Sequence, residues 1–131
     1  MTRNHLSVRI ASCLTTVALC SALLGCETAN KVIWNAQSKS PDGAWLALAH
    51  AENVDGPGIN AQWTMVEMKQ NLNTTQPVMI LNFDEDEGAV KDLKMNWVTS
   101  SHLDVTYRGN APVTFQAIKA FSKDITVEHL P

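Results

Sequence analysis

The chain has 131 residues, with 10 basic and 13 acidic side chains and a net charge of −3 at pH 7. This length allows one domain rather than several. Arg3 and Arg9 precede the first acidic residue, Glu27, so the chain beyond them carries 8 basic against 13 acidic residues, a net charge of −5. The acidic balance argues against nucleic acid and anionic lipid headgroups as partners, because both require a basic footprint.

Residues 1–25 are predicted to be a signal peptide with a helical apolar region. Arg3, His5 and Arg9 form a short positive front, and the 15 residues from 10 to 24 carry no charge. That run falls short of the roughly 20 apolar residues that a helix needs to cross a bilayer core. Its length is typical of the apolar region of a cleaved signal peptide.

The apolar run ends in Leu23-Leu24-Gly25-Cys26, which resembles the bacterial lipobox. The resemblance implies that the Cys26 thiol is joined to a diacylglycerol, and that a signal peptidase then cuts between Gly25 and Cys26. The new amine would then be acylated, with palmitate as a representative chain. Three acyl chains would anchor the protein stably, because one chain binds only marginally and two are sufficient. The alternative interpretation is an uncleaved anchor helix with a bystander cysteine.

The residue after Cys26 bears on location. In Gram-negative lipoproteins of this kind, an Asp at that position tends to retain the protein in the inner membrane. Glu27 stands there instead, so the resemblance implies the outer membrane of the cell envelope, with the domain facing the periplasm. Residues 26–31 form the expected tether, whose five residues after the cysteine reach at most about 17 Å. The domain should therefore lie close to the bilayer.

Residues 32–131 are predicted to form one mainly β domain, a small antiparallel sheet or meander. Alternation of apolar and polar residues indicates strands. The clearest predicted strand spans residues 61–69, where apolar side chains occur on both faces. Residues 113–122 fit either a strand or a short helix. The other predicted strands span residues 32–37, 45–51, 77–83, 93–97, 103–108 and 125–128.

Turn residues separate these strands. Ser40-Pro41-Asp42-Gly43 predicts a type I turn, with Pro second and Gly fourth. Asp55–Gly58 is predicted to be a loop, and Arg108–Asn110 a hairpin-like turn. Ser40–Ala47 resembles the turn-and-strand motif of propeller repeats in the periplasmic Tol-system propeller protein. A propeller needs at least four blades of about 40 residues, so the chain is too short to be one.

A longer resemblance, to small uncharacterised bacterial proteins with a Ser-Pro-Asp-Gly hairpin, covers most of the predicted domain. It implies no activity. The matching segments are Ser40–His50, Gly56–Gly58, Ala61–Lys69, Met95–Tyr107 and Ile125–Glu128.

The acidic run Asp84-Glu85-Asp86-Glu87-Gly88 is the most conspicuous charged cluster. Asp84 and Asp86 are weak candidate metal ligands, because hard divalent cations prefer carboxylates. Gly88 and Ala89 occupy the fifth and sixth positions of the run, which departs from the helix-loop calcium pattern. The alternative is a solvated turn between two strands, so we predict no resident metal and no cofactor.

No recognisable catalytic set is present. His50, His102 and His129 each lack a second His or Cys at metal-ligand spacing. The sequence contains no nucleophile elbow, phosphate-binding loop or dinucleotide fingerprint. Ser38-Lys39-Ser40 does not predict a catalytic pair, because adjacent residues on a strand do not face each other. We therefore expect that the protein is not an enzyme.

Each of the four tryptophans, Trp34, Trp45, Trp63 and Trp97, lies within or at the end of a predicted strand. We expect them to fill the core, with one exposed, although a ligand-stacking surface or interface hot spot is the alternative. The predicted function is a membrane-anchored, non-catalytic envelope lipoprotein that binds another envelope component through a sheet edge or an exposed Trp. The competing hypotheses are a module that binds a small ligand or divalent cation through the acidic loop, and an enzyme with a scattered site.

Overall fold

The computed structural model describes residues 29–72 and 74–131. The predicted signal peptide, its cleavage site at Gly25 and Cys26, and the lipidation site therefore lie outside the described residues. Within them the chain is mainly β and contains no helix, which confirms the predicted fold class. The first strand starts at Ala29, three residues before the predicted start at Val32.

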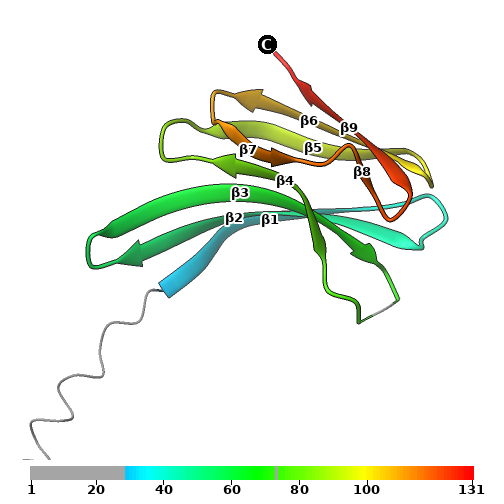
Figure 1. Cartoon of the computed structure of the whole chain (residues 1–131), viewed down its shortest axis with the longest axis horizontal. Helices are drawn as coiled ribbons and strands as arrows, with labels where there is room; N and C mark the ends of the chain where they lie inside the picture. Colours follow the sequence, from blue (N-terminus) through cyan, green and yellow to red (C-terminus); the bar gives the residue numbers. More distant parts are fainter. Residues whose placement is uncertain (1–28, 73) are drawn as a thin grey trace, which may run out of the picture.

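The described residues form nine strands. They are β1 Ala29–Lys39, β2 Trp45–Gly56, β3 Ile59–Gln70, β4 Val78–Asp84, β5 Val90–Thr99, β6 His102–Gly109, β7 Val113–Gln116, β8 Lys119–Ala120 and β9 Lys123–His129. One sheet has the order β1-β2-β3-β4-β7, and the other has the order β5-β6-β9-β8. Figure 1 shows them as two layers, with β1, β2 and β3 in the lower part of the view and β5, β6 and β9 in the upper part.

The division into two sheets corrects the expectation of a single sheet or meander. A sheet with one apolar face must bury that face against another layer, and the second sheet provides this cover. Adjacent strands pair antiparallel, as predicted, except that β6 and β9 run parallel. The predicted hairpin at Arg108–Asn110 is also wrong, because β6 already pairs with β5 and β9. The chain instead crosses to the other sheet and forms β7.

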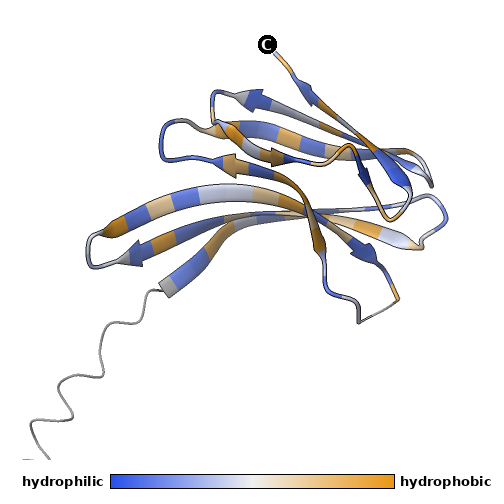
Figure 2. Ribbon diagram, viewed as in Figure 1, coloured by the Kyte–Doolittle hydropathy of each residue, from blue (hydrophilic) through white to orange (hydrophobic). Residues whose placement is uncertain are grey.

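The core lies between the sheets, and one face of β2 contributes to it. Trp45, Ala47, Ala49 and Ala51 are buried, whereas the residues between them are half-buried on the opposite face. Figure 2 shows the same alternation of hydropathy along the strands. Trp45, Ala47 and Ala49 form one core cluster together with Val66, Met68, Ile80, Leu81, Phe83, Trp97, Leu103, Val105, Ala111 and Ile125.

One hydrogen bond crosses between the layers at the buried Trp97 of β5. Its indole Nε1 donates to the backbone carbonyl of Ser38 in β1 at 3.2 Å. Ser38 lies opposite Ala47, a buried residue of the core, in the β1–β2 register. The indole N–H of Trp97 therefore has a hydrogen-bond partner, and this hydrogen bond connects the two sheets.

The ambiguous segment 113–122 forms strands β7 and β8, so the strand alternative is confirmed. Phe121 and Ser122 connect β8 to β9 with φ values of 50° and 61°. Positive φ at both central residues is typical of a two-residue hairpin turn of type I′. Phe121 is an unusual residue for that conformation. Its ring packs on Trp45 at 5.1 Å between centroids, which offsets the strain.

The Ser40-Pro41-Asp42-Gly43 turn has the predicted hydrogen bond, from the Gly43 N–H to the Ser40 carbonyl at 2.8 Å. The Ser40 hydroxyl donates to Asp42 Oδ1 at 2.6 Å and accepts from the Trp45 N–H at 2.9 Å. Gly43 has a φ of 72°, which glycine adopts without a steric penalty. Ser40 is therefore a structural residue of the turn.

We predict a pH dependence at Asp42. Donation from the Ser40 hydroxyl, followed by the Ala44 N–H, lowers the pKa of Asp42 below its ordinary value of 3.8. A carboxyl group with a lowered folded-state pKa stabilises the fold above its unfolded pKa, and this contribution is lost as the pH falls through the folded pKa. Asp42→Ala should therefore reduce the melting temperature at neutral pH, with the gap to wild type narrowing below pH 3.8. Asp55→Ala is the exposed-acid control, and a gap that stayed constant with pH would contradict the prediction.

A second prediction concerns Gly109, which has a φ of 105°. A Cβ at this position would lie 1.9 Å from the Ala89 carbonyl oxygen. Gly109→Ala should lower the free energy of unfolding by about 3 kcal/mol or more, from backbone strain and overpacking. Gly58 also has a positive φ but nothing within 4 Å, so Gly58→Ala should cost only about 1 kcal/mol of strain. Urea unfolding of the two variants measures the difference, and equal losses would refute the clash.

Candidate functional site

A cleft of about 520 Å³ opens between β1 and β5. Each of these strands is an edge strand of its sheet. The cleft therefore lies where two sheet edges face each other. Its volume is within the range of about 300–1,000 Å³ that is typical of ligand sites. Both apolar and charged side chains line it.

The apolar wall depends on an irregularity in β1. The register with β2 shifts between Val32 and Trp34, which makes Ile33 an extra residue. A β-bulge of this kind redirects side chains, and both Ile33 and Trp34 line the cleft. Their exposed fractions are 48% and 41%, which is high for large apolar residues. Leu93 of β5 contributes apolar surface to the same cleft.

Trp34 is thus the exposed tryptophan that the sequence led us to expect. Trp45 and Trp97 are buried in the core cluster. Trp63 is half-buried in β3, where inward-facing residues alternate with it, and its buried indole nitrogen has no hydrogen-bond partner among the described residues. The stacking alternative therefore applies to Trp34.

The polar floor of the cleft is built around Glu85, which follows β4 directly. Thr64 Oγ1 donates to Glu85 Oε2 at 2.6 Å, and Gln62 Nε2 donates to the same oxygen at 3.2 Å. The Val90 N–H donates to Glu85 Oε1 at 2.7 Å. These donors belong to β3 in one sheet and β5 in the other, so the carboxylate links the two sheets and is fixed in position.

Glu85 has no ion-pair partner among the residues that the structure describes. Among the described residues, no Lys, Arg or His nitrogen lies within the ion-pair distance of 4.0 Å from it. Asp92 and Lys94 also line the cleft and carry opposite charges. Asp92 has a φ of 50° at a register irregularity of β5. Glu85 therefore decides the sign of the local charge.

The two candidate metal ligands from the sequence face backbone donors. Asp84 Oδ1 accepts from the Asp86 N–H at 3.1 Å, and Asp86 Oδ1 accepts from the Gln62 N–H at 3.1 Å. In the part of the chain that the structure describes, no three His, Cys, Asp or Glu side chains group closely enough to hold a metal ion. The two aspartates stabilise the crossing from β4 to β5 and do not converge on a common point.

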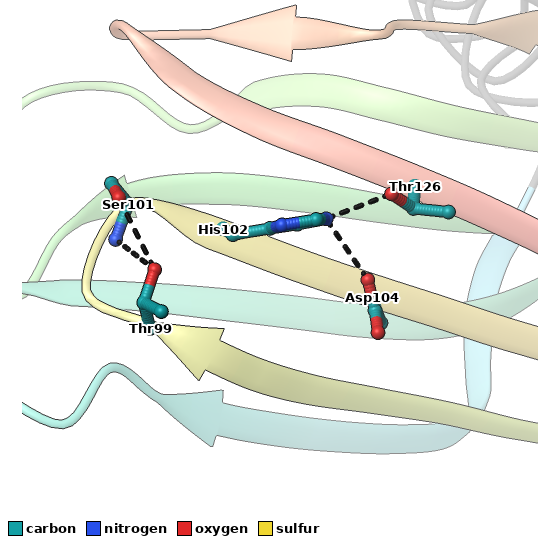
Figure 3. A network of polar contacts seen from close by, with 5 residues as sticks. All are labelled: Thr99, Ser101, His102, Asp104 and Thr126. Carbon is teal, nitrogen blue, oxygen red and sulfur yellow. Dashed lines mark hydrogen bonds and ion pairs between the residues drawn. The ribbon is translucent and has the colours of Figure 1, made fainter.

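The three histidines of the described residues do not line the cleft. His102 Nε2 is 3.1 Å from Asp104 Oδ1 and 2.8 Å from Thr126 Oγ1, as Figure 3 shows. A catalytic relay needs the acid and the hydroxyl on opposite ring nitrogens, whereas both contact the same nitrogen here. In the same view, Thr99 and Ser101 bond to each other and not to His102. This network holds β6 against β9 and is not a nucleophilic site.

The remaining two histidines also have structural contacts. His50 lies 3.4 Å from Glu52 and 4.0 Å from Glu67 on the face of β2 that points away from the core. His129 stacks on Tyr107 at 4.9 Å between ring centroids. Its Nε2 is 2.8 Å from the Gly109 carbonyl oxygen. Each of these histidines therefore contacts a residue of a neighbouring strand.

The sequence missed the cleft and the role of Glu85. Glu85 was visible only as one acid in an acidic run, and two of the three residues that donate to it, Gln62 and Thr64, are distant in sequence. Ile33 was assigned to a strand. The β-bulge that exposes its side chain could not be predicted, because three consecutive apolar residues do not distinguish a bulged strand from a regular one. The one usable signal was the expectation of an exposed tryptophan, which did not specify Trp34.

No protein-family model, curated protein or solved structure matches this chain. Within residues 29–72 and 74–131, no helix has the length and hydrophobicity of a membrane span.

Proposed function

We propose that the protein is a lipid-anchored envelope protein without catalytic activity, whose cleft between β1 and β5 binds a partner protein. The observation that carries the proposal is the pair of exposed apolar residues, Ile33 and Trp34, on the edge strand that follows the lipobox. Large exposed apolar side chains beside a cleft are typical of interaction sites.

The anchor is supported by Leu23-Leu24-Gly25-Cys26 and by its distance from the fold. Two residues, Glu27 and Thr28, lie between Cys26 and the start of β1 at Ala29, so the Cα atoms of Cys26 and Ala29 are at most about 10 Å apart. Acyl chains on Cys26 would hold the cleft strand near the membrane surface. The outer membrane and the periplasmic side remain the location that Glu27 favours.

The binding role is supported by the position of the cleft at two sheet edges. Edge strands present backbone donors and acceptors that an extended partner segment can use. Among the described residues, β1 pairs only with β2 and β5 only with β6. A small-ligand module is the second candidate, favoured by the cleft volume of about 520 Å³.

The anchoring proposal predicts the behaviour of Cys26→Ser. Without the thiol there is no site for the diacylglycerol, so the variant should persist as the full-length precursor and incorporate no fatty acid. Radiolabelled palmitate and intact-mass measurement on membranes from producing cells test this. Cys20→Ser, in the apolar run, is the matched control and should be processed normally. Normal processing of Cys26→Ser would refute the anchor.

The binding proposal predicts a specific crosslink at Trp34. A photoreactive phenylalanine analogue at position 34 should capture the same envelope protein in repeated experiments in intact cells, with the adduct identified by mass spectrometry. Ile118, which is 78% exposed in the segment between β7 and β8, is the control position. The absence of an adduct at position 34, or the same adduct from position 118, would contradict the proposal that the cleft is the binding site.

A further inference from the structure

From the charge and shape of the cleft, we infer the chemistry of its partner: the cleft between β1 and β5 binds a lysine or arginine side chain from an extended segment of another protein. This inference rests on the proposed partner-binding function and specifies what the partner must present. Three features of the cleft support it, namely the charge of Glu85, its fixed geometry and the apolar wall.

The first feature is the unbalanced carboxylate. Glu85 is half-buried, and only neutral groups donate to it. A part-buried charge is costly unless it is paired. Since no described residue provides an ion-pairing cation, a positively charged group from outside the chain would complete the site. The chain beyond Arg9 has 8 basic against 13 acidic residues, which also favours a basic partner during encounter.

The second feature is that Glu85 is fixed before any ligand arrives. Thr64 Oγ1, Gln62 Nε2 and the Val90 N–H occupy three acceptor positions on its oxygens. An ionised carboxylate offers about four lone-pair positions, so about one remains for a ligand. Binding to a group that is already ordered avoids the entropic cost of ordering it. One ammonium or guanidinium donor fits this capacity.

The third feature is the apolar wall that leads to the carboxylate. Ile33, Trp34 and Leu93 line the same cleft as Glu85. Lys and Arg have apolar stems that pack along hydrophobic surface while the charged head finds a polar partner. A short amine would fill the charged end of the cleft but not the wall.

The extended form of the partner follows from the strands that border the cleft. β1 and β5 are edge strands of their sheets, and an extended segment can pair with one of them while its side chain enters the cleft. Asp92 and Lys94 carry opposite charges at the cleft, so they do not reverse the preference for a cation.

The test uses the full lipidated chain in nanodiscs of zwitterionic lipid. Four fluorescent peptides share one extended sequence, Thr-Val-X-Val-Thr, in which X is Lys, Arg, norleucine or Glu. Fluorescence anisotropy should show that the Lys and Arg peptides bind about tenfold tighter than the norleucine peptide, because Lys and Arg can donate a charge-assisted hydrogen bond to Glu85 and norleucine has no donor. The preference should shrink as salt is added.

Three variants assign the preference to the cleft. Glu85→Gln should remove the advantage of Lys over norleucine, whereas Glu87→Gln, at an exposed acid of the same loop, should keep it. Trp34→Ala should weaken the Lys and norleucine peptides by similar factors, because it removes the wall and not the charge. If Glu85→Gln fails to fold, two measurements still test the inference. They are the salt dependence of the Lys preference of the wild type and the binding of the Lys and norleucine peptides by Trp34→Ala.

Equal binding of the Lys and norleucine peptides by the wild type would overturn the inference, as would an equal loss in Glu85→Gln and Glu87→Gln. If butylamine alone bound as tightly as the Lys peptide, the occupant would be a small amine and the partner-protein assignment would be wrong. Intact mass of the same sample reports lipidation of Cys26 separately. A Trp34 crosslink without any Lys preference would reject this inference and leave the proposed function standing.

Discussion

The contact between Trp97 and β1 determines where this domain is closed and where it is open. The buried indole of Trp97 donates to the Ser38 carbonyl at 3.2 Å and so joins an edge strand of one sheet to an edge strand of the other. Earlier along the same two strands, Trp34 and Leu93 line a cleft instead. The two sheets are therefore in contact near the C-terminal end of β1, at Ser38, and leave a cleft of about 520 Å³ beside the middle of β1.

The acidic loop after β4 has a structural role that its composition does not suggest. The chain must cross between sheets here, and each crossing leaves backbone groups without a ladder partner. Glu85 accepts from Val90, and Asp86 accepts from the Gln62 N–H, so carboxylates replace some of the missing partners. The same hydrogen bonds fix Glu85 at the floor of the cleft, so the geometry of the candidate site follows from the way the chain changes sheets.

The sequence predicted what short-range patterns encode. Alternation along β6 identified the face that contains the buried Leu103 and Val105. The four residues from Ser40 to Gly43 specified their turn, because each signal lies within one segment. The second sheet, the parallel β6–β9 pair and the crossing after Gly109 were missed. These features depend on which distant strands pair, and a period of two residues carries no information about that choice. Glu85 was missed for the same reason, since its donors come from β3 and β5.

The edge strands β1 and β5 also give a reason why a side chain, and not backbone pairing alone, should select the proposed partner. An open edge strand invites indiscriminate pairing, which proteins limit with bulges and lysines. β1 has a register shift at Val32/Trp34, with exposed Lys31 and Lys39 near its two ends. β5 has a similar irregularity beside Lys94. Interrupted edges support only short ladders, so the proposed selection of a partner depends mainly on the fixed carboxylate and the apolar wall.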